Sequence, residues 1–275
     1  MGSCEPVVRG VVCAGGSATR LGEATRVANK HLLPVGDRPM IYYPLEMLQV
    51  AGISEVCLIS GPDHAGQFID LLQDGQINRR GTDEPLFNLD ITYRVQAKPG
   101  GIAQAISLAE NFANCGPILV VLGDNLTEFS IRQEIEECRQ ALDHARIFLY
   151  KVKHPEQYGV AVFEAREHGV DLLSEIVEKP TKEKGYEVPP SYWAVTGIYF
   201  FPADVFNVIR TLEPSERGEY EVTDINQYYL KAGRLDYSFL TGWWEDAGES
   251  PEALPAASKM VLQTGANKPL PTDTI

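Results

Sequence analysis

The sequence has few cysteines, and their spacing excludes several classes of protein. Its 275 residues contain five cysteines, an odd number, and no pair has the C-x-x-C spacing typical of zinc ribbons or redox motifs. Cys13 and Cys57 fall within short apolar runs of the kind that form buried strands. We therefore expect free thiols in a reducing compartment rather than the disulfide framework of a small secreted domain.

Long hydrophobic runs are also absent. No apolar stretch approaches the roughly 20 residues that a membrane-spanning helix needs, and residues 1–7 lack the apolar core of a signal peptide. These absences predict a cytoplasmic protein with no membrane partner.

Positive charge is scarce as well. Lysine and arginine together number 24 against 38 aspartates and glutamates, which gives a formal net charge of −14. Proteins that bind nucleic acids carry basic surfaces, so we expect no nucleic-acid partner. In so acidic a chain, basic residues beside glycine turns need a specific explanation, such as a bound phosphate.

The pattern of apolar residues predicts an α/β fold. In the first half, short apolar strands alternate with helices, and such units form a mostly parallel sheet covered on both faces. Residues 78–88 are polar and irregular, which predicts a surface loop. The expected strands are 7–13, 55–60, 91–95 and 118–122, and the expected helices are 39–51, 63–72 and 102–112.

The second half is richer in strands, and no linker separates it from the first. We therefore predict a single domain over residues 1–265, followed by a loose tail over 266–275, which has prolines and no periodicity. The expected strands are 147–151, 160–163, 172–177, 195–201 and 235–241, and the expected helices are 206–212, 223–232 and 251–262. Thr223 and Asp224 are natural N-cap residues for the second of these helices.

A glycine loop with two nearby cations is the strongest functional pattern in the chain. The first strand ends at Gly15-Gly16, where bare backbone N–H groups can surround an anion. Arg20 and Lys30 follow and add positive charge suited to phosphate. A glycine pair after a strand is often an ordinary turn, and the P-loop and dinucleotide fingerprints are absent. The two cations favour a phosphate site.

A second turn at the same sheet edge carries a carboxylate. Asp124 follows the apolar strand 118–122 and Gly123, so it lies at the carboxyl end of a strand, where ligands of such sheets bind. A carboxylate so placed commonly holds Mg²⁺ together with phosphate oxygens. An Asx turn is the alternative interpretation.

These motifs resemble a known family. Residues 14–21, A-G-G-S-A-T-R-L, and residues 30–34, K-H-L-L-P, are similar to the signature of sugar-1-phosphate nucleotidylyltransferases, above all the glucose-1-phosphate thymidylyltransferases. The resemblance extends from about residue 7 to 261, with one departure at Ala18, where the family usually has glycine. It implies a three-layer, Rossmann-like nucleotidyltransferase fold. The nucleotide-binding half would cover about residues 5–145, and a strand-rich sugar-phosphate-binding half about 146–265.

The resemblance also implies which residues bind the nucleotide. Gln96 and Gly101 belong to a motif, Q-x-x-P-G-G-I-A-Q, that recognises the nucleoside in this family; without the resemblance, Gln96 would be taken for a surface glutamine. The implied nucleotide-binding residues are Cys13, Ala14, Gly15, Gly16, Ser17, Ala18, Thr19, Gln96, Gly101 and Asp124.

The sugar phosphate and the metal have their own implied residues. The E-K-P motif supplies Glu178 for sugar hydroxyls and Lys179 for the sugar phosphate, although a surface ion pair is the plainer interpretation. Asp246 takes the aspartate position of a W-x-D-x-G motif and would hold Mg²⁺ with Asp124, with Glu245 as the rival ligand. The implied sugar-phosphate-binding residues are Asn125, Gly159, Glu178, Lys179 and Val195.

The reaction implied by the resemblance is the transfer of a thymidylyl group from dTTP to glucose 1-phosphate. Arg20 and Lys30 would stabilise the departing pyrophosphate, while Lys179 would hold the attacking phosphate. The expected catalytic residues are Arg20, Lys30, Asp124, Lys179 and Asp246. UTP or CTP as the nucleotide, another hexose phosphate, and a non-catalytic sugar-nucleotide sensor are the alternatives, and a homo-oligomer is one possibility.

Regulation is expected to be simple. Longer thymidylyltransferases resembling this chain continue past the W-x-D-x-G motif through helices that help build a second nucleotide site. Only one helix and the tail are expected here, and allostery needs a distinct second site. We therefore expect a dTDP-sugar to inhibit by competing with dTTP at the active site.

Overall fold

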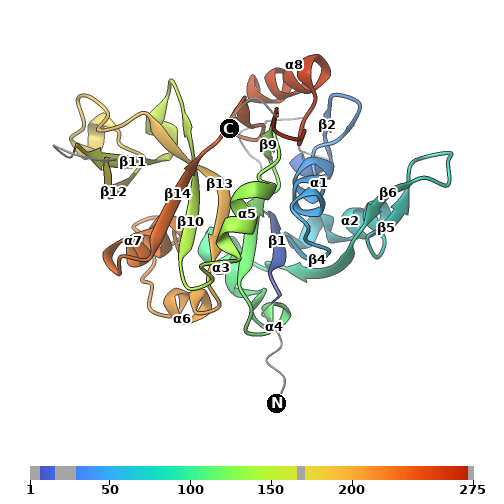
Figure 1. The fold of residues 1–275 in the computed structure, drawn as a ribbon, viewed down its shortest axis with the longest axis horizontal. Coiled ribbons are helices and arrows are strands. Elements are labelled where there is room, and N and C mark those ends of the chain that lie inside the picture. The colour runs from blue at the N-terminus through green and yellow to red at the C-terminus, as the bar shows by residue number, and fades with distance from the viewer. Residues whose placement is uncertain (1–6, 16–28, 166–170, 272–275) are drawn as a thin grey trace.

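A mostly parallel sheet forms the centre of the computed structural model, which describes residues 7–15, 29–165 and 171–271 (Figure 1). Of the seven strands that form its main part, six run parallel to one another and β13 runs against its neighbours. The mostly parallel sheet predicted from the sequence is confirmed. Across the sheet the strands are β14 (Leu235–Phe239), β10 (Ala145–Lys151), β13 (Trp193–Phe201), β8 (Ile118–Leu122), β1 (Arg9–Ala14), β4 (Glu55–Ser60) and β7 (Asp90–Val95).

Helices cover both faces of this sheet because side chains alternate across each strand. In β1, Val11 and Cys13 face one apolar layer, while Val12 and Ala14 face the other. The fold therefore has the three layers that the sequence predicts. The first layer contains α3 (Ile102–Ser107), α4 (Glu110–Ala113), α6 (Val205–Ile209) and α7 (Val222–Lys231), and the second contains α1 (Tyr42–Val50), α2 (Ala65–Leu72) and α5 (Arg132–Cys138).

One small strand pair extends the central sheet, and a second forms a separate sheet next to β13. The hairpin β11 (Gly159–Glu164) and β12 (Leu172–Glu178) joins β13 through a single pair, Val160 and Ala194. The second pair joins β9 (Asn125–Thr127) to β15 (Trp244–Asp246), with Asn125 opposite Asp246. A third core, between α8 (Ala253–Thr264), β2 (Pro34–Val35) and α1, supports this pair.

The structure corrects two predictions of secondary structure. Residues 78–88, predicted as an irregular loop, contribute to a hairpin of β5 (Gln76–Asn78) and β6 (Pro85–Asn88) that projects from the body (Figure 1). Its anchor is Phe87, which is 2% exposed and packs edge-on against Tyr42. The helix predicted over 102–112 is divided into α3 and α4, with shorter i to i−3 hydrogen bonds at residues 108 and 109. A tertiary contact, which local patterns do not show, decides the first case.

The end of the chain is partly packed. Asn267 and Lys268 fall in the segment that the sequence predicts as a loose tail, yet their backbone N–H groups donate to the carbonyls of Thr127 and Glu128 at 3.0 and 2.9 Å. Asn267 is only 5% exposed. This part of the segment therefore belongs to the folded body.

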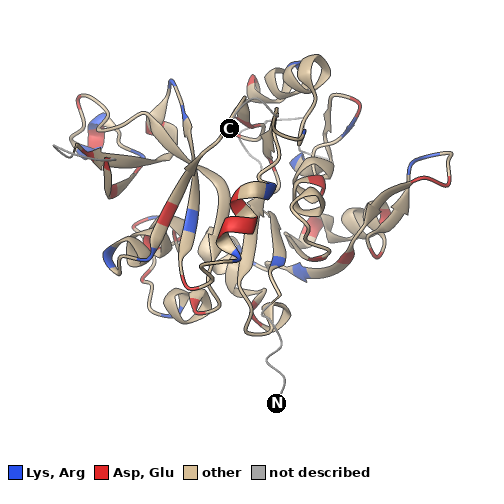
Figure 2. Ribbon diagram, viewed as in Figure 1, with Lys and Arg blue, Asp and Glu red and all other residues tan. Residues whose placement is uncertain are grey.

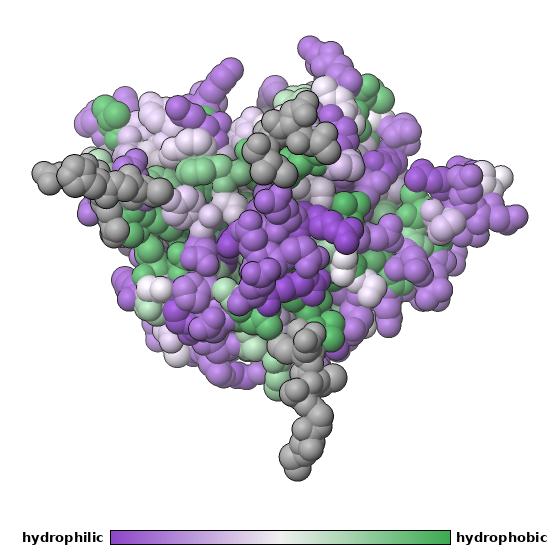
Figure 3. Space-filling view, viewed as in Figure 1, coloured by the Kyte–Doolittle hydropathy of each residue, from purple (hydrophilic) through white to green (hydrophobic). Residues whose placement is uncertain are grey.

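Basic and acidic residues are both spread along the chain (Figure 2). Hydrophilic side chains gather over α5 in the middle of the face in view (Figure 3). The four cysteines that the structure describes are free, as expected, and Cys13, Cys57 and Cys138 are buried. Within the described ranges, no helix is long and apolar enough to cross a membrane.

The packing of β13 generates a prediction about stability. Phe200 is fully buried against the second helical layer, whereas Phe239 at the sheet edge is 45% exposed. Phe200→Ala should lower the free energy of unfolding by about 3–5 kcal/mol, because it leaves a cavity in a close-packed core. Phe239→Ala, the matched control, should lower the free energy of unfolding much less. Urea unfolding midpoints test this, and equal losses in the two variants would contradict the assignment of the core.

Candidate active site

A cleft with a cavity volume of about 370 Å³ opens at the carboxyl ends of β1 and β8. The Gly123 N–H donates to the Cys13 carbonyl at 2.9 Å and so joins the two strand ends, as the sequence predicts. Ala14 lies behind the cleft, fully buried. Gly16, Ser17, Ala18, Thr19 and Arg20 lie outside the described residues. The other predicted site residues all line the cleft: Cys13, Gly15, Lys30, Gln96, Gly101, Asp124, Asn125, Gly159, Glu178, Lys179, Val195 and Asp246.

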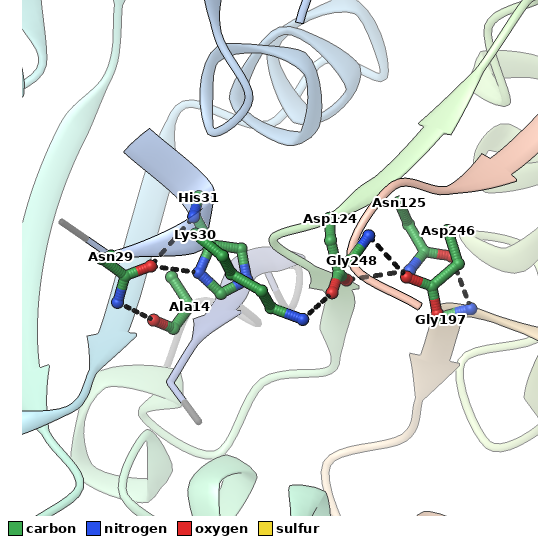
Figure 4. Close-up of polar contacts among 9 residues, drawn as sticks. All are labelled: Ala14, Asn29, Lys30, His31, Asp124, Asn125, Gly197, Asp246 and Gly248. Atoms are coloured by element: carbon green, nitrogen blue, oxygen red, sulfur yellow. Dashed lines mark hydrogen bonds and ion pairs between the residues drawn. The ribbon is translucent and has the colours of Figure 1, made fainter. Parts of the chain in front are cut away.

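A buried polar network holds Lys30 at the cleft (Figure 4). Asn29 accepts from the backbone N–H of His31 at 3.0 Å and from its Nδ1 at 2.6 Å, and it donates to the Ala14 carbonyl at 3.2 Å. Burial, with the Lys30 charge as a second cause, lowers the pKa of His31 to about 3, so its ring is neutral. Gly123 lacks a side chain where any Cβ would overlap this ring. The network fixes the 3-10 turn Lys30–Leu32 against the end of β1.

Lys30 forms an ion pair with Asp124 inside the cleft. Asn125 Nδ2 also donates to Asp124 Oδ1, at 3.2 Å. Burial alone would raise the pKa of Asp124, but the Lys30 ammonium outweighs it and holds that pKa well below its usual range. Asp124 is therefore ionised at neutral pH.

Asp246 lies beside Asp124 and is affected by its charge. Burial first, and the charge of Asp124 second, raise the pKa of Asp246 well above its usual value. The Gly248 N–H donates to Asp246 Oδ1 at 3.1 Å, and a side chain at Gly248 would collide with Asp124 and Lys30. Two carboxylates thus share one buried space, and their repulsion favours a bound cation.

Glu245 is less well placed to be a metal ligand. It adjoins Asp246 in β15, but its side chain does not line the cleft. Burial raises its pKa to about 7. Within the described parts of the chain, no group of three or more His, Cys, Asp and Glu side chains could hold a metal ion by itself. Next to Lys30, the cleft therefore places Asp124 and Asp246 side by side, and two carboxylates are what Mg²⁺ commonly takes when phosphates supply further oxygens.

Asn125 joins the strands that carry the two carboxylates. Its Oδ1 accepts from the Gly197 N–H and from Trp244 Nε1, both at 2.8 Å, and its side chain is 1% exposed. Gly197 leaves room for this amide, since a Cβ there would lie 2.5 Å from Asn125 Nδ2. Asn125 therefore connects β9, β13 and β15 directly under the cleft.

Gln96 and Gly101 line the side of the cleft near Gly15. Gln96 Nε2 donates to the Gly101 carbonyl at 3.1 Å and to Gln104 Oε1 at 2.6 Å, so the amide has a fixed orientation. Gly101 has φ +91° and lies against the backbone of Tyr220, where a side chain would clash. This wall presents amide and backbone groups suited to the edge of a base.

Glu178 and Lys179 form the opposite side. Lys179 has a left-handed backbone, φ +46°, and its N–H donates to the Tyr158 carbonyl at 2.9 Å. Such a conformation is costly for a lysine and is typical of functional positions. Thr223, predicted as an N-cap residue, instead donates to Glu178 Oε2 at 2.6 Å, and the N-cap position of α7 belongs to Glu221.

Several residues of the site are not apparent from the motifs. Asn29 and Trp244 act through hydrogen bonds to distant backbone or side chains, and nothing in their local sequence signals this. Arg217 lines the cleft and pairs with Glu221 at 2.8 Å. In so acidic a chain, a basic residue next to a glycine is the one feature of the local sequence that indicates a site residue here.

Comparison with known sequences places these residues in a family. Residues 9–264 match the sequence model of the family described as nucleotidyl transferase. Glucose-1-phosphate thymidylyltransferase of Neisseria meningitidis is 39% identical over 254 residues, which cover 91% of this chain and 82% of the relative. The enzyme of the same name from Mycobacterium tuberculosis is 39% identical over 252 residues, with coverage of 91% and 81%.

Solved structures agree with the fold. A crystal structure from Bacillus anthracis, assigned as a glucose-1-phosphate thymidylyltransferase and holding sucrose, has a TM-score of 0.82 at 40% identity and covers 94% of this chain and 96% of its own. UDP-glucose pyrophosphorylase complexed with UDP-glucose has a TM-score of 0.79 at 23% identity, with coverage of 94% and 99%, and so shares the fold. On its sequence and its architecture, this chain belongs to the nucleotidyl transferase family.

Proposed function

We propose that the protein transfers a thymidylyl group from dTTP to glucose 1-phosphate, giving dTDP-glucose and pyrophosphate. The observation that carries this proposal is the convergence of Lys30, Asp124, Lys179 and Asp246, from four separate parts of the sequence, in one cleft. Relatives that are 39% identical over 91% of the chain carry the name of this activity. A uridylyl or cytidylyl transfer is not favoured, because the relative named for UDP-glucose shares only the fold.

The chemistry requires positioning more than proton transfer. In the proposed reaction, a phosphate oxygen of the sugar phosphate attacks the α-phosphorus of dTTP in line, and pyrophosphate leaves. The second pKa of a phosphate monoester is about 6, so the nucleophile is largely a dianion at neutral pH and needs no general base. The task of the protein is to bring two anions together and to stabilise the charge of the transition state.

Asp124 and Asp246 fit a magnesium ion. Their carboxylates share a buried space, and both the burial and the Asp124 charge that raise the pKa of Asp246 disfavour its ionised form, which a divalent cation would stabilise. When bound there, Mg²⁺ would screen the α-phosphate. We propose that Lys30, which lies against Asp124, and Arg20, outside the described residues, stabilise the departing pyrophosphate.

The sugar phosphate is assigned to the side of the cleft formed by the β11–β12 hairpin. Lys179 would hold its phosphate, and Glu178, oriented by Thr223, would accept from sugar hydroxyls. A Cβ at Gly159 would lie 3.1 Å from Glu178 Oε2, so glycine keeps this carboxylate accessible. Gln96, Gly101 and the glycine loop would hold the nucleotide on the other side. We propose that this reaction takes place in the cytoplasm, in keeping with the free thiols.

The first functional prediction concerns the substrates. With Mg²⁺ and glucose 1-phosphate, dTTP should support pyrophosphate release at a higher kcat/KM than UTP or CTP. The measurement is pyrophosphate release across an array of nucleotides and sugar phosphates, with product identity checked by mass. Turnover with UTP or CTP alone would contradict the thymidylyl assignment, and no turnover with any nucleotide would favour a sensor.

A second prediction concerns the two carboxylates. Asp124→Asn and Asp246→Asn keep size but remove charge, so each should raise the Mg²⁺ concentration needed for half-maximal rate and lower kcat by about 100-fold. A group that acts mainly in the transition state lowers kcat and kcat/KM together. Glu245→Gln is the matched control and should stay close to wild type. Normal rates at ordinary Mg²⁺ in both aspartate variants would rule out their metal role.

A third prediction distinguishes Lys179, which is proposed to bind the sugar phosphate, from its neighbour Lys182. Lys179→Ala should raise the KM for glucose 1-phosphate by roughly 10-fold or more, because a charge-assisted hydrogen bond to phosphate is lost. The KM for dTTP should change little. Lys182→Ala, an exposed neighbour, serves as the control. If Lys179→Ala changed only the KM for dTTP, the two ends of the cleft would be reversed.

A further inference from the structure

Asn267 occupies an unusual position beyond the last helix. It is 5% exposed, although it follows α8 near the end of the described chain, and its backbone is left-handed at φ +52°. Asparagine is one of the few residues with a side chain that tolerates this conformation. A buried polar side chain in such a backbone conformation needs specific partners.

Its amide group connects two elements on either side of it. Nδ2 donates to the Tyr43 carbonyl at 3.0 Å and to Glu46 Oε2 at 3.1 Å, both in α1. Thr127 Oγ1, in β9, donates to Asn267 Oδ1 at 3.4 Å, and the Asn267 N–H donates to the Thr127 carbonyl at 3.0 Å. One side chain thus ties α1 to β9.

The β9 side of this connection leads directly to the two carboxylates. Asp124 immediately precedes β9, and β9 pairs with β15 so that Asn125 lies opposite Asp246. The Ala247 N–H further donates to the Asp124 carbonyl at 2.9 Å. A shift of β9 would therefore move Asp124 and Asp246 together.

The α1 side leads to Lys30. The Ile41 N–H, at the start of α1, donates to the His31 carbonyl at 2.8 Å, and the Met40 N–H donates to the Leu33 carbonyl at 3.0 Å. The turn that carries Lys30 is thereby fixed to the helix that Asn267 contacts. Arg38 donates to both oxygens of the Glu46 carboxylate, to Oε1 at 3.2 Å and to Oε2 at 3.0 Å, so the partner of Asn267 is itself fixed.

We propose that Asn267 is a positioning residue, which sets the placement of Lys30 relative to Asp124 and Asp246 by fixing β9 against α1. This inference rests on the proposed function and deepens it, because it assigns to the end of the chain a role in the metal site. Asn267 does not line the cleft. Its effect passes through the backbone that carries the carboxylates.

The main variant is Asn267→Asp, which keeps the shape and the tolerance for a left-handed backbone but replaces both N–H donors with a carboxylate facing Glu46. The double variant Glu46→Gln/Asn267→Asp restores a donor opposite the new acceptor. Asn114→Asp is the matched control, since Asn114 has a similar φ of +49° but is exposed at the end of α4. Asn267→Gly serves as a second variant if the aspartate prevents folding.

Three quantities are measured: kcat, the Mg²⁺ concentration for half-maximal rate, and amide hydrogen exchange of segments 124–130 and 243–249 without substrate. Asn267→Asp should lower kcat 10–100-fold and raise the Mg²⁺ requirement, as is usual when a residue supporting a metal ligand is lost. It should also speed exchange in both segments. The double variant should recover most of each effect, and Asn114→Asp should show none.

The outcomes separate this inference from the proposed function. Wild-type kcat and Mg²⁺ dependence in Asn267→Asp would overturn the inference, even if the melting temperature falls. A lower kcat with unchanged exchange and unchanged Mg²⁺ requirement would overturn it too. A wild-type protein that transfers no nucleotide would instead overturn the proposed function, and the exchange of the two segments would still decide whether Asn267 fixes them.

Discussion

Two carboxylates in one buried space are the constraint on which the rest of this structure depends. Burying ionised groups beside each other is unfavourable unless cations and hydrogen bonds compensate. Here Lys30 compensates Asp124, while Asp246 keeps a raised pKa. The surrounding features serve this arrangement. Asn125 joins the strands beneath it, and Gly248 leaves the room that a side chain would fill. In the proposed function, such a site would hold a divalent cation, whose positive charge compensates the two carboxylates and in turn attracts phosphate oxygens.

The topology explains why these groups meet. Parallel strands place their carboxyl ends at one edge, so the ends of β1 and β8 bring Gly15 and Asp124 to the same cleft. The β9–β15 pair then brings Asp246 from more than a hundred residues later to face Asn125. The β11–β12 hairpin closes the other side with Glu178 and Lys179. The two sides suit the two anionic substrates of the proposed reaction.

Much of this could be predicted from the sequence because the relevant signals are local. The apolar runs 55–60 and 118–122 coincide with β4 and β8, and the position of Asp124 after a strand placed it at the correct edge. The β5–β6 hairpin was missed because Phe87 is buried by Tyr42, a contact across 45 residues that no local pattern shows. The Lys30–Asp124 pair and the role of Asn267 were beyond prediction for the same reason, since each depends on partners distant in sequence. The sequence motifs identified the side chains of the site, and only the fold showed which hydrogen bonds and ion pairs hold them in place.

The central claim is that the paired carboxylates and a bound nucleotide hold one divalent cation between them. The most direct test is to titrate Mn²⁺, as a paramagnetic substitute for Mg²⁺, into the protein with dTTP and to follow free Mn²⁺ by electron paramagnetic resonance. The account predicts one site per chain in the ternary complex, with an affinity clearly higher than that of dTTP alone. An ion held no more tightly in the complex than by dTTP in solution would contradict it.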